Sequence, residues 1–289
     1  MTCSIIDGNA IAQKIKTEIQ ARAQQMAADG RKVHLTAILV GATPAAELYA
    51  KRQGETCQAV GIEYSLLKLP VEITEDQLKR EIHRLNQDRN VTGVMLHMPL
   101  PKHIDATRMQ YEIDAVKDVE GVNPANLGYV VYGHALMAPC TALAAVELAK
   151  STGVEIRGAE AVVIGASAIA GKPAALLLAD LRATVTICRT TTRDLKFHTT
   201  RAEFLIVAAG KAGLITADHV REGAVVIDVG INRITLPDGT KKTVGDVDFE
   251  SVRGKAGYLT PVPGGVGPMT VAMLLRNTLR SAEILHGVK

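Results

Sequence analysis

The sequence predicts an α/β protein with two domains. Short apolar runs alternate with helical stretches along most of the 289 residues, as in a mostly parallel sheet covered by helices. In the second half, glycines follow the apolar runs, as they do at the carboxyl ends of strands in a doubly wound fold. The chain is also long enough for two domains of about 150 residues each. We therefore expect an N-terminal α/β domain and a doubly wound Rossmann-type domain, with a cleft between them.

The first half begins with a helix and then alternates strand and helix. Isoleucines at every fourth position predict an amphipathic helix over 9–28. The apolar run at 33–40 predicts a buried strand, and a Gly-Ala-Thr-Pro turn then opens a helix that ends at Gly61. Further strands are expected at 62–69 and 92–98, and further helices at 74–87, where Thr74 is the cap, and at 105–113.

The second half predicts a repeat of strand and helix with a hairpin near its end. Pro139 and Thr141 precede a helix that continues to Ser151. The last helix is long enough to leave the second domain and pack on the first, so we expect domains at 1–138 with 270–289 and at 139–269. Strands are expected at 160–164, 184–188, 204–208 and 225–229, helices at 172–181 and 268–286, and a hairpin-like turn at Pro237-Asp238-Gly239.

Composition argues against several classes of function. The chain has no tryptophan, three phenylalanines and a net charge of +3, which argues against a nucleic-acid partner. The four cysteines are far apart and form no CxxC pair, so neither a zinc site nor a disulfide framework is expected. No histidine pair has the helical spacing of a metal site, and no apolar stretch predicts a membrane span or a signal peptide. We expect the reducing cytoplasm as the compartment.

The segment 260–270 contains three glycines and three prolines, followed by an apolar helical pattern. Glycine leaves φ free and proline fixes φ and removes a donor, so this segment is expected to form a shaped loop. Pro268 suits the start of the helix, whose free amides would face whatever lies in front of them. A tight connector without any ligand is the alternative.

The first strand of the second domain leads directly into a glycine turn and a helix. Gly165 permits the turn, Ser167 offers a hydroxyl and an amide, and Gly171 allows the helix to pack closely. The amino end of such a helix favours phosphate. An ordinary strand-to-helix turn also explains the motif alone, but its position between strand and helix favours dinucleotide binding.

These motifs together resemble the methylenetetrahydrofolate dehydrogenase/cyclohydrolase family. The loop at 260–270 resembles the family's C-terminal signature, and segments at 139–141, 228–232 and 245–247 also fit the family pattern. The resemblance extends over essentially the full chain. It implies NAD(P)-dependent oxidation of 5,10-methylenetetrahydrofolate to the methenyl form, NADP as the cofactor with NAD possible, and a homodimer formed through the second domain.

The resemblance also implies a set of site residues, three of which depart from the family. Tyr49 is expected to stack on the folate. Gln53 replaces the family's proton-handling lysine, His97 replaces a glutamine, and Glu120 replaces the aspartate that binds the pterin edge. The other substrate-binding residues are expected to be Pro263, Gly264 and Gly265, and the cofactor-binding residues Gly165, Ala166, Ser167, Ile169, Arg189, Thr190, Gly210, Gly230, Ile231 and Thr270.

The expected contact with the 2′-phosphate of NADP also departs from the family. Ala166 stands where the family has an arginine, and Arg189 follows the second strand, where such folds bind the ribose. Arg189 with Thr190 could bind the phosphate, because guanidinium makes bidentate contacts to phosphate oxygens. A solvated surface arginine is the alternative.

These departures lead us to expect a weak or lost cyclohydrolase. Hydride transfer needs little beyond position, whereas hydrolysis of the methenyl group needs general acid or base catalysis. His97 could serve as a base, oriented by Glu120, or it could be a structural residue of its strand. Two alternatives remain: a dehydrogenase for another folate-like or cyclic aminal substrate, and a non-catalytic protein that binds nucleotide or folate.

Overall fold

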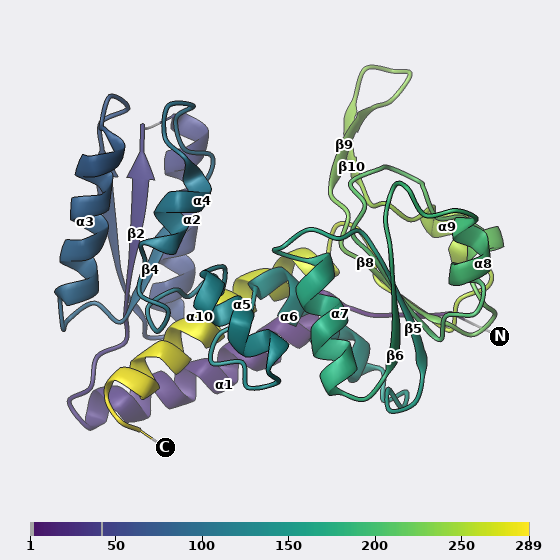
Figure 1. Cartoon of the computed structure of the whole chain (residues 1–289), viewed down its shortest axis with the longest axis horizontal. Helices are drawn as coiled ribbons and strands as arrows, with labels where there is room; N and C mark the ends of the chain where they lie inside the picture. The colour runs from purple at the N-terminus through teal and green to yellow at the C-terminus, as the bar shows by residue number, and fades with distance from the viewer. Residues whose placement is uncertain (1–2, 42, 289) are drawn as a thin grey trace. The chain divides into compact units, whose positions relative to one another are not determined.

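The computed structural model describes residues 3–41 and 43–288, which form two compact units (Figure 1). One unit comprises the residues up to Gln13 together with Pro139–Met273, and the other comprises Lys14–Ala138 and the residues from Leu274. We call them the six-stranded unit and the three-stranded unit, after the sheet that the described residues form in each. Of the predicted turn at 41–44, Ala42 lies outside the described residues.

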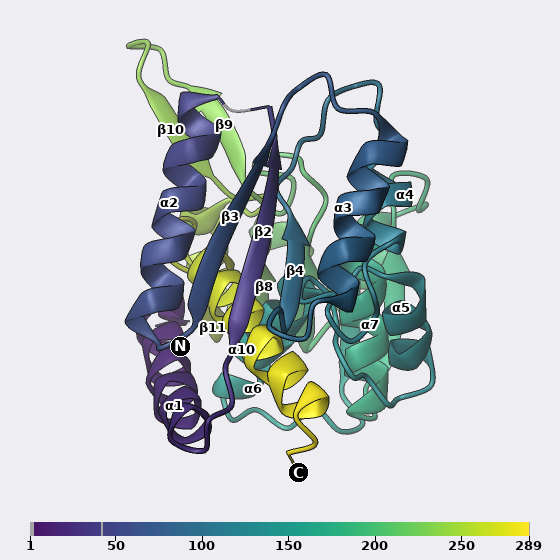
Figure 2. The same ribbon diagram turned by 90° about the vertical axis from the view of Figure 1, so that its left-hand side faces the viewer.

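The three-stranded unit is built on a parallel sheet of order β3-β2-β4. Helices α2 and α3 lie on opposite sides of this sheet in both views (Figures 1 and 2). Apolar side chains from β2, α3 and β4 form its core, which supports the sheet against α3. The elements are β2 (His34–Val40), α2 (Pro44–Ala59), β3 (Glu63–Leu69), α3 (Glu75–Gln87), β4 (Gly93–Leu96), α4 (Ala106–Tyr111) and α5 (Pro124–Val131).

Side-chain caps fix where three of these helices begin. The Thr43 hydroxyl accepts a hydrogen bond from the Ala46 amide at the start of α2. Thr74 caps α3, as the sequence predicts, and it exchanges hydrogen bonds with Gln77 as a capping box. The Asn123 side chain caps α5, a helix that the sequence analysis does not predict.

The six-stranded unit holds a parallel sheet of order β1-β11-β8-β7-β5-β6 among the described residues. A core cluster of this unit consists mainly of valine, alanine, isoleucine and leucine side chains, with Cys188, from the sheet and the segments that adjoin it. The strands are β1 (Ser4–Ile5), β5 (Glu160–Ile164), β6 (Thr184–Cys188), β7 (Phe204–Val207), β8 (Val225–Asp228) and β11 (Tyr258–Leu259), with an antiparallel hairpin of β9 (Asn232–Thr235) and β10 (Lys241–Val244). The helices are α6 (Cys140–Ser151), α7 (Gly171–Asp180), α8 (Leu195–Thr199), η1 (Ala217–His219) and α9 (Phe249–Arg253).

Two helices continue from one unit into the other. Helix α1 (Gly8–Ala28) begins in the six-stranded unit, and α10 (Val266–Leu285) ends in the three-stranded unit. Within the six-stranded unit a Cβ on Gly8 would lie 1.9 Å from the Gly265 carbonyl oxygen, so only glycine fits there. Within the three-stranded unit, the buried Asn277 amide on α10 donates to the carbonyls of Val119 and Ala138.

The predicted domain boundaries differ from these units at residues 3–13 and 270–273. Strand β1 pairs in parallel with β11, which places the start of the chain in the six-stranded sheet. Both strands have only two residues, too few for an apolar run or an alternation to reveal them.

Among the described residues, no helix combines the length and the apolar character that a membrane span requires.

Candidate active site and cofactor site

Helix α2 presents Gln53 to the interior of the three-stranded unit. Ala50, Gln53, Gly54 and Cys57 are its buried residues, so Gln53 lies on the helix face that covers the sheet. The Gln53 amide nitrogen is 3.0 Å from the Met95 sulfur on β4. Position 53, which the family resemblance predicts to handle protons, therefore carries a buried, neutral amide.

Gln53 and His97 are joined by a residue that the sequence analysis does not single out. The Tyr64 hydroxyl is 3.3 Å from Gln53 Oε1 and 3.4 Å from His97 Nε2. Tyr64 lies on β3 and His97 directly follows β4, so two strands and α2 each contribute one of these side chains. The only sequence signal for Tyr64 is an aromatic residue in a strand whose other residues are leucines and polar side chains.

The ring of Tyr49 lies edge-on to His97, with ring centroids 5.8 Å apart and an interplanar angle of 85°. Tyr49 is 59% exposed, whereas His97 is 5% exposed. Burial lowers the pKa of His97 below its usual value, which favours a neutral imidazole. The structure thus brings Tyr49, Gln53 and His97 together around an exposed aromatic face.

Glu120 lies beyond Asp118, beside the strand end that also carries His97. Burial and, to a smaller extent, the Asp118 carboxylate raise the pKa of Glu120 to about 7, against the opposing effect of a hydrogen bond with the Leu96 backbone. The charge of Glu120 in turn raises the pKa of Tyr49, after the larger effect of burial. Glu120 is thus electrically coupled to Tyr49 and can hold or release a proton near neutral pH.

Asp118 is a structural acceptor. Its carboxylate accepts from the amides of Gly121 and Asn123 and from the side chain of Asn126. Burial raises its pKa, and these hydrogen bonds oppose that shift. Asp118 therefore fixes the segment that carries Glu120.

The glycine turn after β5 forms one wall of a cavity of about 660 Å³ in the six-stranded unit. A Cβ on Gly165 would lie 2.0 Å from the Ala208 carbonyl oxygen, and one on Gly171 would lie 2.0 Å from the Gly165 carbonyl oxygen. The turn needs both glycines, as the dinucleotide hypothesis requires. The lining residues include Gly165, Ala166, Ser167, Arg189, Thr190, Thr192, Ala208, Ala209 and Lys211.

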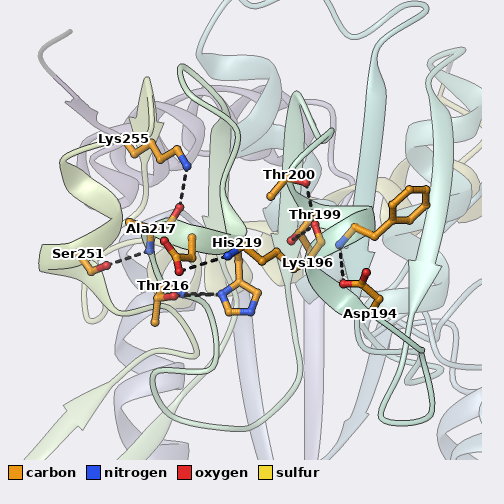
Figure 3. Close-up of polar contacts among 11 residues, drawn as sticks. Asp194, Lys196, Thr199, Thr200, Thr216, Ala217, His219, Ser251 and Lys255 are labelled. Carbon is orange, nitrogen blue, oxygen red and sulfur yellow. Dashed lines mark hydrogen bonds and ion pairs between the residues drawn. The ribbon is translucent and has the colours of Figure 1, made fainter.

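Polar contacts fix the segments that follow β6 and β7 (Figure 3). Lys196 on α8 pairs with Asp218 on η1, with nitrogen and oxygen 3.2 Å apart. The Ala217 amide donates to the Ser251 hydroxyl, and Lys255 donates to the Ala217 carbonyl. These contacts tie α8, whose first residue lines the cavity, to η1 and α9.

The glycine- and proline-rich loop lines a second hollow of the six-stranded unit, of about 340 Å³. Pro263, Gly264 and Gly265 line it together with Gly230 and Ile231. Three predicted residues lie outside the lining of both hollows, namely Ile169, Gly210 and Thr270. Each has a local reason: Ile169 is 56% exposed, the Gly210 amide donates to Asp246, and the Thr270 hydroxyl bonds back to Val266 within α10.

Two buried aspartates hold the loops between these hollows. The Asp228 carboxylate accepts from the amides of Gly230, Asp246 and Val247, and Asp246 accepts from those of Ala209 and Gly210. Burial raises the pKa of Asp228 to about 6, although these amides oppose the shift. The loops after β7 and β8 therefore depend on side-chain acceptors.

These features define a class of protein before any comparison. A parallel doubly wound sheet with a glycine turn at a cavity beyond its strand ends is the architecture of a dinucleotide-dependent enzyme. Two family models match the chain: the tetrahydrofolate dehydrogenase/cyclohydrolase catalytic domain at residues 6–120 and its NAD(P)-binding domain at residues 139–286. The chain belongs to the tetrahydrofolate dehydrogenase/cyclohydrolase family.

Individual relatives match over nearly the whole chain. The bifunctional protein FolD of Cupriavidus necator is 47% identical over 99% of this chain and 100% of its own length. The structure of the bifunctional dehydrogenase/cyclohydrolase FolD of Campylobacter jejuni is 43% identical with a TM-score of 0.92, covering 98% of this chain and 99% of that one. That of Trypanosoma brucei FolD, complexed with NADP and an inhibitor, is 35% identical with a TM-score of 0.90 and covers 98% of each chain.

The comparisons confirm the predicted α/β fold class, the family, the enzymatic nature of the chain and its NAD(P) cofactor. They do not test the individual site residues or the domain roles, which stay predictions. The homodimer, the cytoplasmic location and the absence of a nucleic-acid partner also stay predictions.

The raised pKa of Glu120 predicts a specific dependence of stability on pH. Its folded-state pKa of about 7 lies above the usual 4.5, so its contribution to stability is complete below pH 4.5 and is lost as pH rises through 7. In Glu120→Gln the free energy of unfolding should fall less between about pH 5 and about pH 8, by on the order of 1 kcal/mol. Urea unfolding at several pH values measures this, with the exposed Glu72→Gln as control. Parallel curves for wild type and Glu120→Gln would contradict the assignment.

Proposed function

We propose that this protein oxidises 5,10-methylenetetrahydrofolate to the methenyl form with NADP as its main cofactor. The observation that supports this most is the pair of family models, which match both halves of the chain. The relative from Trypanosoma brucei, whose structure holds NADP, supports the choice of cofactor. The family resemblance suggests a homodimer, and the composition of the chain suggests a cytoplasmic location without a nucleic-acid partner.

In this proposal, the three-stranded unit binds the folate and the six-stranded unit binds the dinucleotide. The exposed Tyr49 ring offers a stacking surface, and Glu120 offers a carboxylate for the pterin edge. The cavity at Gly165 fits a pyrophosphate, because its glycines leave no side chain and the amino end of α7 favours anions. The family resemblance adds Pro263, Gly264 and Gly265, which line the smaller hollow, as further substrate-binding residues.

When bound, the nicotinamide accepts the hydride. The protein then needs only to hold the methylene carbon in place, because a neighbouring nitrogen lone pair stabilises the developing cation. A neutral Gln53 and a neutral His97 do not interfere with that step.

We further propose that the cyclohydrolase activity of this chain is weak. The relatives are named bifunctional, so this proposal rests on residues 53, 97 and 120 rather than on the comparisons. Hydrolysis requires a group that exchanges protons with water, and the Gln53 amide does not titrate. No specific observation favours a different substrate or a purely binding role.

A spectrophotometric time course tests the function. Purified protein is mixed with 5,10-methylenetetrahydrofolate and NADP or NAD, and pre-formed methenyl compound is supplied separately. We expect reduced NADP to form and the methenyl product to decay slowly, with a small but measurable excess over the buffer rate. If folded protein reduced neither cofactor, the dehydrogenase proposal would fail.

The position of Arg189 predicts the cofactor preference. Arg189 is exposed and lines the cavity beyond β6, where a 2′-phosphate would lie. In Arg189→Ala the KM for NADP should rise about tenfold, because a charge-assisted hydrogen bond is lost. The KM for NAD should change little. The exposed Arg157→Ala is the control, and an equal rise of both KM values in Arg189→Ala would contradict the assignment.

Restoring a lysine at position 53 tests the account of the hydrolase. Gln53→Lys should raise methenyl hydrolysis by at least about tenfold if the amide is the main defect, since general acid or base catalysis contributes about 10²–10⁴-fold. The readout is decay of the methenyl compound above the buffer rate. An unchanged rate in a folded variant would show that His97 or Glu120 also blocks this chemistry.

A further inference from the structure

Tyr64 occupies a position between the two altered polar residues of the site. Its hydroxyl lies 3.3 Å from Gln53 Oε1 and 3.4 Å from His97 Nε2, so it bridges α2 and the end of β4. Neither composition nor the family resemblance assigns it a role. The Tyr64 hydroxyl can donate to only one of these two partners, so the other partner must donate to it or leave it unbonded.

The Met95 sulfur determines the orientation of the Gln53 amide. A thioether sulfur can only accept, so the NH2 group of Gln53 must face it, at 3.0 Å. The amide oxygen then faces Tyr64, which the bond from the Tyr64 hydroxyl to Oε1 requires. Gln53 is therefore an acceptor toward Tyr64.

That orientation fixes the proton on His97. A tyrosine hydroxyl has one proton, and donation to Gln53 leaves only its lone pairs for the imidazole. Nε2 of His97 must then donate to Tyr64 and carry the proton of the neutral ring. Among the described residues, Nδ1 of His97 has no hydrogen-bond partner, so it keeps a free lone pair.

We propose that Tyr64 is a positioning residue, which with Gln53 holds His97 as the Nε2–H tautomer and leaves Nδ1 as the basic nitrogen of the site. In this chain of hydrogen bonds, His97 Nε2 donates to the Tyr64 hydroxyl, and this hydroxyl donates to Gln53 Oε1. The NH2 group of Gln53 donates to the Met95 sulfur. The arrangement differs from a lone histidine, whose tautomer is free to exchange.

The surroundings support this arrangement. Burial raises the pKa of Tyr64, with smaller effects of Cys57 and Tyr49, so the hydroxyl keeps its proton near neutral pH. The lowered pKa of His97 keeps the ring neutral. Gly54 gives the Tyr64 ring its space, because a Cβ there would lie 2.8 Å from the ring carbon Cδ1.

By leaving Nδ1 of His97 basic, Tyr64 provides a proton acceptor for the remaining cyclohydrolase activity. This consequence rests on the proposed function. As the water oxygen bonds to the methenyl carbon, the π electron pair of the cationic C=N bond moves onto its nitrogen, and one water proton passes to Nδ1 of His97, which later returns it to solvent. The adduct then breaks its bond from this carbon to one nitrogen, which takes the hydroxyl proton, and a formyl group remains. Tyr64 does not touch the reacting atoms.

The test is the tautomer of His97, read by NMR on protein with ¹⁵N-labelled histidine at a pH well above the His97 pKa. Comparison with His97→Gln identifies its signals among the eight histidines. Wild type should show the Nε2–H tautomer. In Gln53→Leu the Tyr64 proton loses its acceptor and turns to Nε2, so the tautomer should change to Nδ1–H.

Three further variants test whether the change of the His97 tautomer depends on the acceptor at position 53 and on the Tyr64 hydroxyl. Gln53→Glu keeps an acceptor and should keep the Nε2–H tautomer. Adding Tyr64→Phe to Gln53→Leu should abolish the change to Nδ1–H, because the hydroxyl that causes it is gone. The exposed Tyr111→Phe, the matched control, should leave the His97 signals as in wild type.

Several results would overturn the proposal. These are an Nδ1–H tautomer in wild type, no change in Gln53→Leu, or the same change with and without the Tyr64 hydroxyl. If Gln53→Leu does not fold, Gly54→Ala serves instead, because displacement of the Tyr64 ring should perturb the His97 nitrogen signals, and unperturbed signals would contradict the proposal.

The two enzyme activities provide a second, independent test of the role of Tyr64. In Tyr64→Phe, kcat for methenyl hydrolysis above the buffer rate should fall about tenfold with little change in KM, while dehydrogenase turnover changes little. An equal loss of both activities would indicate a merely structural role and would contradict the proposal. The NMR measurement needs no folate, so an inactive dehydrogenase would overturn the proposed function and leave the tautomer measurable.

Discussion

The parallel alignment of strands is the constraint on which both sites depend. Parallel strands bring their carboxyl ends to the same edge of a sheet, so residues far apart in sequence meet there. In the three-stranded unit this edge carries His97 after β4. In the six-stranded unit it carries Gly165 after β5 and Arg189 after β6, and both line one cavity.

Burial at these edges then determines which groups carry charge. It lowers the pKa of His97 and raises those of Glu120 and Asp228, so each group shifts toward its neutral form. The polar groups that remain near Tyr49 are arranged by hydrogen bonds more than by ion pairs. Such surroundings hold the groups around Tyr49 in place, which is the main requirement of a hydride transfer.

Much of the fold could be predicted from the sequence because its signals are local. Strand patterns predicted the strands of the two parallel sheets other than the two-residue β1 and β11, a Pro-Asp-Gly turn predicted the hairpin, and Thr74 predicted the cap of α3. The two-residue strands β1 and β11 were missed because pairing between distant segments, rather than local pattern, creates them. For the same reason the grouping of residues 3–13 with the six-stranded unit was not foreseen.

The sequence indicated several residues of the site, but it did not show which side chains join them by hydrogen bonds. Motif positions indicated Tyr49, Gln53 and His97, and the structure brings these three together. Tyr64 was not foreseen, because nothing local shows that a strand residue reaches both α2 and the end of β4. Ile169, Gly210 and Thr270 were indicated by motif alone and stay predictions: Ile169 is exposed, the Gly210 amide donates to Asp246, and the Thr270 hydroxyl donates to the Val266 carbonyl.

The central claim is that the methylene carbon of the folate gives up a hydride directly to the nicotinamide. The most direct measurement uses 5,10-methylenetetrahydrofolate with deuterium on the methylene carbon and follows the mass of the reduced NADP. The account predicts that the reduced cofactor carries deuterium and that it forms more slowly than from the unlabelled substrate. Reduced cofactor without deuterium, or no reduced cofactor at all, would contradict it.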